Sequence, residues 1–268
     1  MKINFLNIKD LLLSQGYIIV SNLVSHEHLD LIHNKMIVET REMIKKNKWG
    51  GVGSIKGHIQ QNPPRYTPYV FKDILSNSTV LEISRLILGN NFFNDFYSAN
   101  TNCPGSIAQP VHIDCAPKKK DENISNLPIS LVINIPLVKV SKNNGSMEIW
   151  PMTHKIFTPK KYIDEKILEE RRKTIPPIRA DMSKGSILIR DVRTWHRGMP
   201  NLSENPRHML AMIHHAHSVQ PGEKIAFSKG CENEILNVGI NHHVYFTEDF
   251  IDHSIDPTYG AYSVINEI

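Results

Sequence analysis

The stretch Gln109-Pro110-Val111-His112-Ile113-Asp114 gives the first indication of what this chain is built to do. In an extended segment successive side chains point to opposite sides, so His112 and Asp114 point to the same side. An imidazole and a carboxylate then converge on one point. With one further histidine they form a set of two histidines and one carboxylate, which leaves three coordination positions of a divalent metal open. A single His-x-Asp pair also occurs in loops without a metal, so the rest of the chain must decide.

The overall composition is that of an ordinary folded protein. The chain has 268 residues, of which 40% are hydrophobic and 22% are charged, and its formal net charge is +4. This length suits a single large β-rich domain with a substantial core. The basic run Lys118–Lys120 is followed at once by Asp121 and Glu122. Because no basic cluster is interleaved with aromatic residues, we expect no nucleic-acid partner.

Cysteine usage and hydropathy indicate where the protein works. Cys103, Cys115 and Cys231 show no C-x-x-C spacing, which argues against a disulfide framework and against a structural zinc site. No stretch reaches the roughly 18 apolar residues of a membrane span. We therefore expect a cytoplasmic protein with no membrane partner.

The first third of the chain shows helical patterns around one short strand. Helices are predicted over 8–14, from Ser25 to about Lys46, and over 78–88, where Gly89 follows as a C-cap. A β-branched strand is predicted over 17–20. The glycine-rich segment 49–68 fits neither a phosphate-binding loop nor a dinucleotide fingerprint, and it is either a surface loop or a lid over a pocket.

From Phe92 onward the pattern changes to period 2 and short apolar runs. One further helix is predicted over about 160–173. The predicted strands cover 94–102, 108–113, 129–138, 146–150, 186–189, 194–198 and 208–217. Many short strands with Gly and Pro turns indicate a mainly β fold with flanking helices, either a sandwich or a jelly roll.

Four motifs in this half occur in the order of a known family. They are Gln109–Asp114, the Asn-Gly signature from Asn144 to His154, the strand motif Gly185–Asp191, and His196 followed by Arg207. Together they resemble the phytanoyl-CoA dioxygenase family of Fe(II)/2-oxoglutarate oxygenases, over about 15–217. The resemblance implies a cupin-like jelly roll, or double-stranded β-helix. We then expect one domain over 1–268, with a helical part (about 1–90) packed on the jelly-roll core (about 91–220) and a C-terminal extension (about 221–268).

The resemblance also assigns roles to residues. His112, Asp114 and His196 match the metal ligands, so Fe(II) is the expected metal, with 2-oxoglutarate and O2 as cosubstrates. Arg207 matches the arginine that anchors 2-oxoglutarate, and a planar guanidinium suits a carboxylate better than an ammonium does. The expected activity is a dioxygenase that hydroxylates an unactivated C–H and releases succinate and CO2.

Three further residues are weaker candidates for contact with the cosubstrate. Asn134 is a polar residue within an apolar strand and needs a partner if it is buried. Gln109 stands three residues before His112, and Tyr97 is a candidate that a core tyrosine would explain equally well. The chain also departs from the family pattern, most notably at Gly198, where some relatives carry a serine that contacts the cosubstrate.

The substrate and the outcome of the reaction stay open. We expect a small-molecule substrate, a biosynthetic or natural-product intermediate. Asp114 favours hydroxylation over halogenation, because relatives that halogenate replace this carboxylate with a small residue. The same metal chemistry could instead give desaturation, cyclisation or epimerisation. A jelly-roll protein that binds a metal without redox chemistry is the alternative from another class. The sequence does not indicate an oligomeric state.

Overall fold

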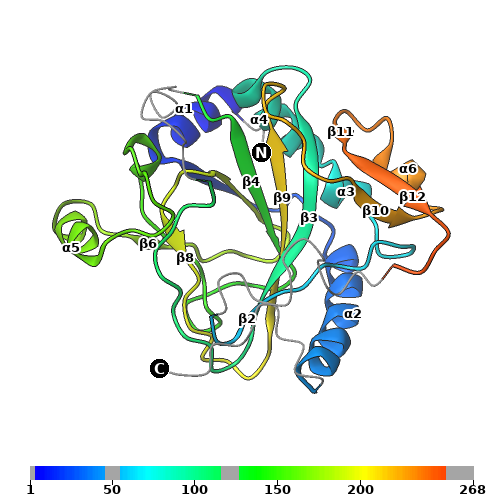
Figure 1. Cartoon of the computed structure of the whole chain (residues 1–268), viewed down its shortest axis with the longest axis horizontal. Helices are drawn as coiled ribbons and strands as arrows, with labels where there is room; N and C mark the ends of the chain where they lie inside the picture. Colours follow the sequence, from blue (N-terminus) through cyan, green and yellow to red (C-terminus); the bar gives the residue numbers. More distant parts are fainter. Residues whose placement is uncertain (1–3, 46–54, 116–126, 252–268) are drawn as a thin grey trace.

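The computed structural model describes residues 4–45, 55–115 and 127–251. Its largest element is a seven-stranded sheet (Figure 1). The strands lie side by side in the order β1 (Tyr17–Val20), β7 (Ile187–Asp191), β4 (Ser130–Pro136), β9 (Arg207–His215), β3 (Phe93–Asn102) and β11 (Asn241–His242), and β2 (His58–Gln60) also pairs with β3. The pairs among β1, β7, β4, β9 and β3 are antiparallel.

A smaller sheet faces the large one across the cavity described below. It consists of β6 (Ile178–Arg179), β5 (Glu148–Ile149) and β8 (His196–Arg197), all antiparallel. On the other side of the molecule, β10 (Ile225–Ser228) and β12 (Val244–Thr247) form a parallel pair (Figure 1). Two facing sheets with flanking helices are the mainly β jelly-roll fold that was predicted.

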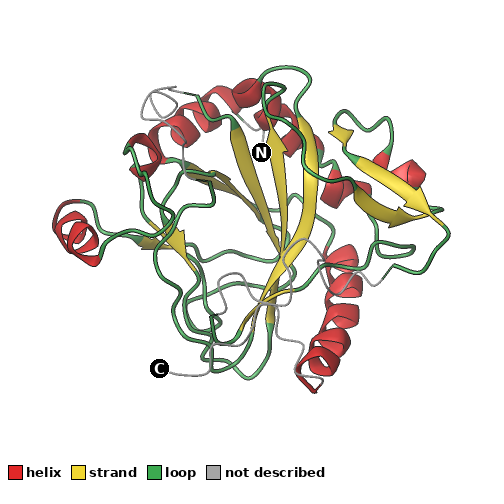
Figure 2. Ribbon diagram, in the orientation of Figure 1, coloured by secondary structure: helices red, strands yellow, loops and turns green. Residues whose placement is uncertain are grey.

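Helices cover the outer face of the large sheet, as the red ribbons of Figure 2 show. These helices are α1 (Phe5–Gln15), α2 (His26–Lys45), α3 (Lys72–Leu75), α4 (Ser78–Leu88) and α6 (Glu232–Ile235). Their apolar faces and the outer face of the sheet form the main core, which includes Leu29, Ile83 and Leu210. Helix α5 (Glu165–Thr174) lies apart from them and buries Leu168 in a separate small core, and η3 (Thr153–Lys155) is a short 3-10 turn. Among the described helices, none is long and apolar enough to cross a membrane.

Local sequence explains most of these elements. The Asn77 side chain accepts hydrogen bonds from the backbone N–H groups of Thr79 and Val80, which caps the start of α4. Helix α2 buries Leu29, Ile32, Met36 and Met43, whose spacings of three, four and seven residues place them on one face. The predictions for 17–20 and 78–88 match β1 and α4 residue for residue.

Other boundaries needed correction. The strand predicted over 108–113 does not form. Within this segment only His112 makes β-bridges, and these are isolated ones. Pro110 has no N–H to donate to a neighbouring strand, which helps to explain this. The predicted loop 49–68 contains β2, while its residues 49–54 lie outside the described part. The large sheet also draws on both ends of the chain, because β1 and β2 come from the first 90 residues and β11 comes from the residues after 220.

Gly16 ends α1 at a point where the chain is tightly packed. Its φ is +87°, and a Cβ there would lie 2.5 Å from His154 Nδ1 and 2.7 Å from Thr194 Oγ1. Gly105 also has positive φ, +72°, but nothing lies within 4 Å of its added Cβ. We expect Gly105→Ala to cost about 1 kcal/mol of unfolding free energy, from the left-handed backbone alone.

For Gly16→Ala we expect a loss of about 2–4 kcal/mol, because overpacking adds to the backbone cost. Urea unfolding of the two variants measures the difference. Equal losses in both would show that the close approach of His154 and Thr194 has no energetic consequence.

Candidate metal centre

The segment around His112 lies against β8, which brings three side chains together. The backbone N–H of His112 donates to the His196 carbonyl at 2.9 Å, and the N–H of His196 donates to the His112 carbonyl at 3.0 Å. Val111 and Ile113 point the other way, into a small core with Trp150 and Trp195. His112, Asp114 and His196 each offer a ligand atom, and these atoms lie within 4.8 Å of one another.

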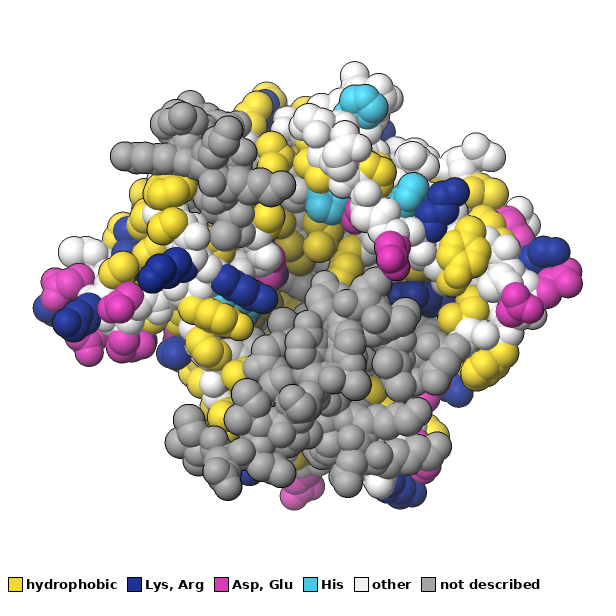
Figure 3. Space-filling model, viewed as in Figure 1, with side chains coloured by type: hydrophobic (Ala, Val, Ile, Leu, Met, Phe, Trp, Pro, Cys, Tyr) yellow, Lys and Arg dark blue, Asp and Glu magenta, His cyan; other side chains and the backbone are white. Residues whose placement is uncertain are grey.

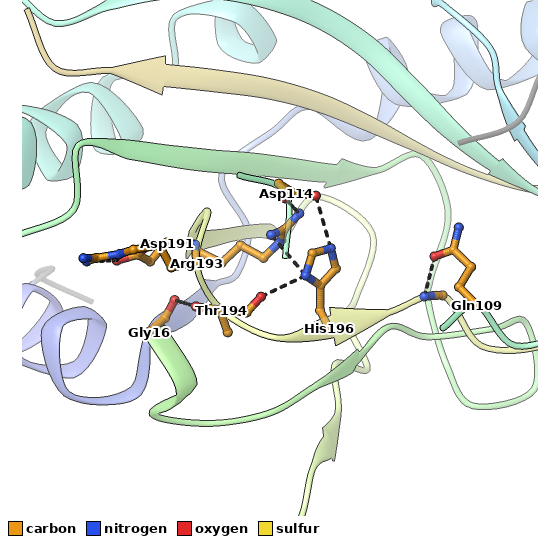
Figure 4. Close-up of polar contacts among 9 residues, drawn as sticks. Gly16, Gln109, Asp114, Asp191, Arg193, Thr194 and His196 are labelled. Atoms are coloured by element: carbon orange, nitrogen blue, oxygen red, sulfur yellow. Dashed lines mark hydrogen bonds and ion pairs between the residues drawn. The ribbon is translucent and has the colours of Figure 1, made fainter. Parts of the chain in front are cut away.

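Backbone carbonyls orient both imidazoles. The Nδ1–H of His112 donates to the Pro110 carbonyl at 2.9 Å, and that of His196 donates to the Thr194 carbonyl at 2.9 Å. Both Nε2 atoms are therefore left as acceptors, and Nε2 of His196 lies 3.5 Å from Oδ1 of Asp114. Figure 4 shows the His196 ring between Thr194 and Asp114. Such partners are typical of metal-ligating histidines.

The electrostatics of the site favour the protonation states that bind a metal. Burial lowers the pKa of His112 and lowers that of His196 further, so both imidazoles are neutral. Burial would raise the pKa of Asp114, but the charge and the hydrogen bond of the Arg190 guanidinium outweigh it and hold that pKa well below its usual range. Two neutral imidazoles and an ionised carboxylate are the forms that a divalent metal requires.

The three side chains open into a cavity of about 200 Å³ between the two sheets. Residues that share one face of the large sheet by strand register line it: Asn102 on β3 is opposite Arg207 on β9, and Asn134 on β4 is opposite Ala211. Figure 3 shows a hollow with a hydrophobic floor near the middle of this face, over β4, β9 and β3.

Arg207 is a buried cation in this cavity. The residue is 5% exposed, one of its NH2 groups donates to the Gly145 carbonyl at 3.0 Å, and its Nε is buried without a partner. Burial lowers the pKa of its guanidinium to about 10. Within the described part of the chain no carboxylate forms an ion pair with it. Because a buried charge is costly unless it is paired, Arg207 is suited to an anionic ligand.

The weaker candidates divide between the two faces of the sheet. Asn134 is 1% exposed, lines the cavity, and its Oδ1 has no hydrogen-bond partner. Gln109 also lines the cavity, and its Oε1 accepts from the N–H of Gly198 at 2.8 Å (Figure 4). Tyr97 is not brought to this site. Its ring lies in the main core on the opposite face and stacks on Phe227, which corrects the placement expected from the sequence.

Sequence reasoning missed most of the residues that line the cavity, among them His58 and Arg190. His58 lies on β2, and a Cβ added to Gly198 would come within 2.6 Å of its Cε1. The imidazole therefore occupies the space of the side chain that Gly198 lacks. The glycine at position 198, where some relatives carry a serine, was the signal that another side chain fills this space. The sequence could not show that this side chain is His58, because His58 reaches the cavity through the pairing of β2 with β3.

The donor set tests whether Fe(II) suits the site. Two imidazole Nε2 atoms and one carboxylate form the facial set of non-haem iron oxygenases, and the cavity adds a buried arginine and an unpartnered amide oxygen. Fold and site together define a jelly-roll protein with a centre fit for Fe(II). A family model described as "Phytanoyl-CoA dioxygenase (PhyH)" matches residues 12–209. The chain belongs to this family, which supports an oxidoreductase of the iron- and 2-oxoglutarate-dependent oxygenase class.

A solved structure shows the same fold. The crystal structure of AviO1 from Streptomyces viridochromogenes Tue57 superposes with a TM-score of 0.60 at 15% sequence identity. The match covers 83% of this chain and 99% of that one. At this identity the likeness concerns the fold alone, and it agrees with the predicted jelly roll.

Proposed function

We propose that this protein is an Fe(II)/2-oxoglutarate-dependent dioxygenase that hydroxylates an unactivated C–H of a small metabolite. The observation that carries the proposal is the pairing of features in one cavity. The His112, Asp114 and His196 ligand set opens into the same cavity as Arg207, whose buried charge has no carboxylate partner among the described residues. A dicarboxylic acid that reaches from the metal to Arg207 satisfies both.

The chain's own residues bind and orient. His112, Asp114 and His196 would hold Fe(II), which with 2-oxoglutarate and O2 supplies the oxidising power that converts R–H into R–OH, with release of succinate and CO2. Arg207 would bind the far carboxylate of 2-oxoglutarate with its planar fork. Asn134 lines the cavity and has a side-chain N–H to offer the cosubstrate. Gln109 accepts a hydrogen bond from the backbone N–H of Gly198 and so fixes this part of the cavity wall.

The remaining residues of the cavity indicate what kind of substrate would fit. Polar side chains of Gln60, Ser98 and Asn100 line it together with Val132 and Ile213. This mixture favours a small molecule with both polar and apolar parts, such as a biosynthetic intermediate. Desaturation, cyclisation and epimerisation use the same centre, and analysis of the product separates them from hydroxylation.

The first test is an anaerobic titration of 2-oxoglutarate into the Fe(II)-loaded protein. We expect the visible charge-transfer band that forms when a 2-oxoacid chelates Fe(II). His112→Ala is expected to lose the band completely, because two protein ligands hold the metal far more weakly than three. A folded, metal-loaded protein that gives no band would refute the oxygenase and leave the non-redox metal-binding protein as the alternative.

A further inference from the structure

Arg190 on β7 forms an ion pair with only one of the two oxygens of the Asp114 carboxylate. Its side chain is 4% exposed, and an NH2 group lies 2.6 Å from Oδ2 of Asp114. The other oxygen, Oδ1, lies 3.5 Å from Nε2 of His196, on the side where the imidazole acceptors converge. One carboxylate oxygen thus faces the candidate metal position and the other is held by the guanidinium.

The other contacts of Arg190 do not explain its position. Its Nε is buried without a hydrogen-bond partner. Its NH1 lies 3.5 Å from Nδ1 of His196, but that nitrogen already donates its hydrogen to the Thr194 carbonyl, so two donors face each other there. By strand register Arg190 is opposite Val132 of β4 on one side and Tyr17 of β1 on the other, and neither carries a negative charge. The pair with Asp114 is therefore the interaction that compensates for burying this cation.

We propose that Arg190 is a positioning residue that orients Asp114 so that Oδ1 faces the metal. The inference rests on the proposed function. Two imidazoles and one carboxylate oxygen occupy three of six positions, and a chelating 2-oxoacid takes two more, which leaves one for O2. By holding Oδ2, Arg190 fixes the carboxylate in the orientation that presents Oδ1 as the third ligand atom.

Positioning and simple charge predict opposite effects when Arg190 is neutralised. A positive charge beside a metal site repels the cation, so removing it should tighten metal binding if charge alone mattered. If Arg190 instead orients Asp114, its loss should weaken metal binding by about 10–100-fold, as is typical when the partner of a metal ligand is removed.

The experiment measures Fe(II) affinity anaerobically, by competition with a chromophoric chelator, in wild type, Arg190→Met, Arg190→Gln and Arg190→Lys. We expect about 10–100-fold weaker binding in the Met and Gln variants, since neither side chain reaches Asp114 with a charged donor. The Lys variant, which keeps a donor near Oδ2, should recover most of the affinity. Either neutral variant, if folded, that binds Fe(II) as tightly as wild type or more tightly would overturn the proposal. Arg190→Gln keeps the cavity polar and carries the test if Arg190→Met does not fold.

Arg193→Gln is the matched control. Arg193 lies two residues after the end of β7 and, like Arg190, is paired with a carboxylate, that of Asp191, at 2.6 Å (Figure 4). Unlike Arg190, it does not line the cavity. We expect its loss to lower the thermal midpoint and to leave Fe(II) affinity within about threefold. The failures are distinguishable: a wild-type protein that binds Fe(II) without the 2-oxoglutarate band refutes the proposed function, whereas an intact band with unchanged affinity in the Arg190 variants refutes only the positioning role.

Discussion

Replacement of Arg207 by methionine is expected to weaken 2-oxoglutarate binding by a hundredfold or more. The guanidinium is 5% exposed and lacks a carboxylate partner among the described residues, so the ligand carboxylate would be its main counter-charge. Losing one partner of such a buried charged pair costs about 2–5 kcal/mol, because the other charge is left unpaired. Titration of the charge-transfer band in the anaerobic Fe(II) protein measures the change.

Two controls separate this role from a structural one. Arg207→Lys keeps the charge but loses the bidentate fork, so we expect affinity between those of wild type and the Met variant. Fe(II) affinity should stay near the wild-type value in both, since Arg207 contacts none of the three ligands. If Arg207→Met bound 2-oxoglutarate as well as wild type, the cosubstrate would have to lie elsewhere in the cavity.

The positions of the candidate ligands followed from local sequence although the expected strand did not form. Alternation along 110–114 needs only an extended backbone, and β8 on one side and residues 161–163 on the other supply its hydrogen bonds. His112 and Asp114 therefore face the cavity while Val111 and Ile113 face the small core. His196 and Arg207 were placed by the spacing of family motifs, and the fold brings both to the same cavity.

Residues whose placement depends on long-range register were beyond the sequence. A shift in register between Asn94 and Tyr97 decides which face of β3 each later side chain occupies. This shift puts Phe96 and Ser98 in the cavity and Tyr97 in the core. Arg190 likewise belongs to the cavity only because β7 pairs with β4 in one register.

Buried histidines lead to the second large effect, loss of stability in mild acid. His208, His214 and His242 are at most 6% exposed. Burial lowers their pKa values to about 3, 3 and 4, respectively. Each is tied to a neighbouring hydroxyl: His208 to Thr40 at 2.8 Å, His214 to Ser84 at 2.8 Å and His242 to Ser76 at 3.0 Å. The folded state therefore keeps all three neutral at pH values where the unfolded chain, with pKa values near 6.5, takes up protons.

Because the unfolded state binds more protons below about pH 6.5, stability must fall as the pH falls towards the folded-state pKa values. These three histidines contribute roughly 4 kcal/mol per pH unit to the slope between about pH 6 and 4.5, against a typical total stability of about 5–15 kcal/mol. Urea unfolding at a series of pH values measures this slope. His214→Gln should reduce the measured slope by about 1.4 kcal/mol per pH unit, which is the contribution of one imidazole. A stability that stayed constant from pH 7 to 5 would mean that these imidazoles become charged without unfolding, which their burial and hydroxyl partners oppose.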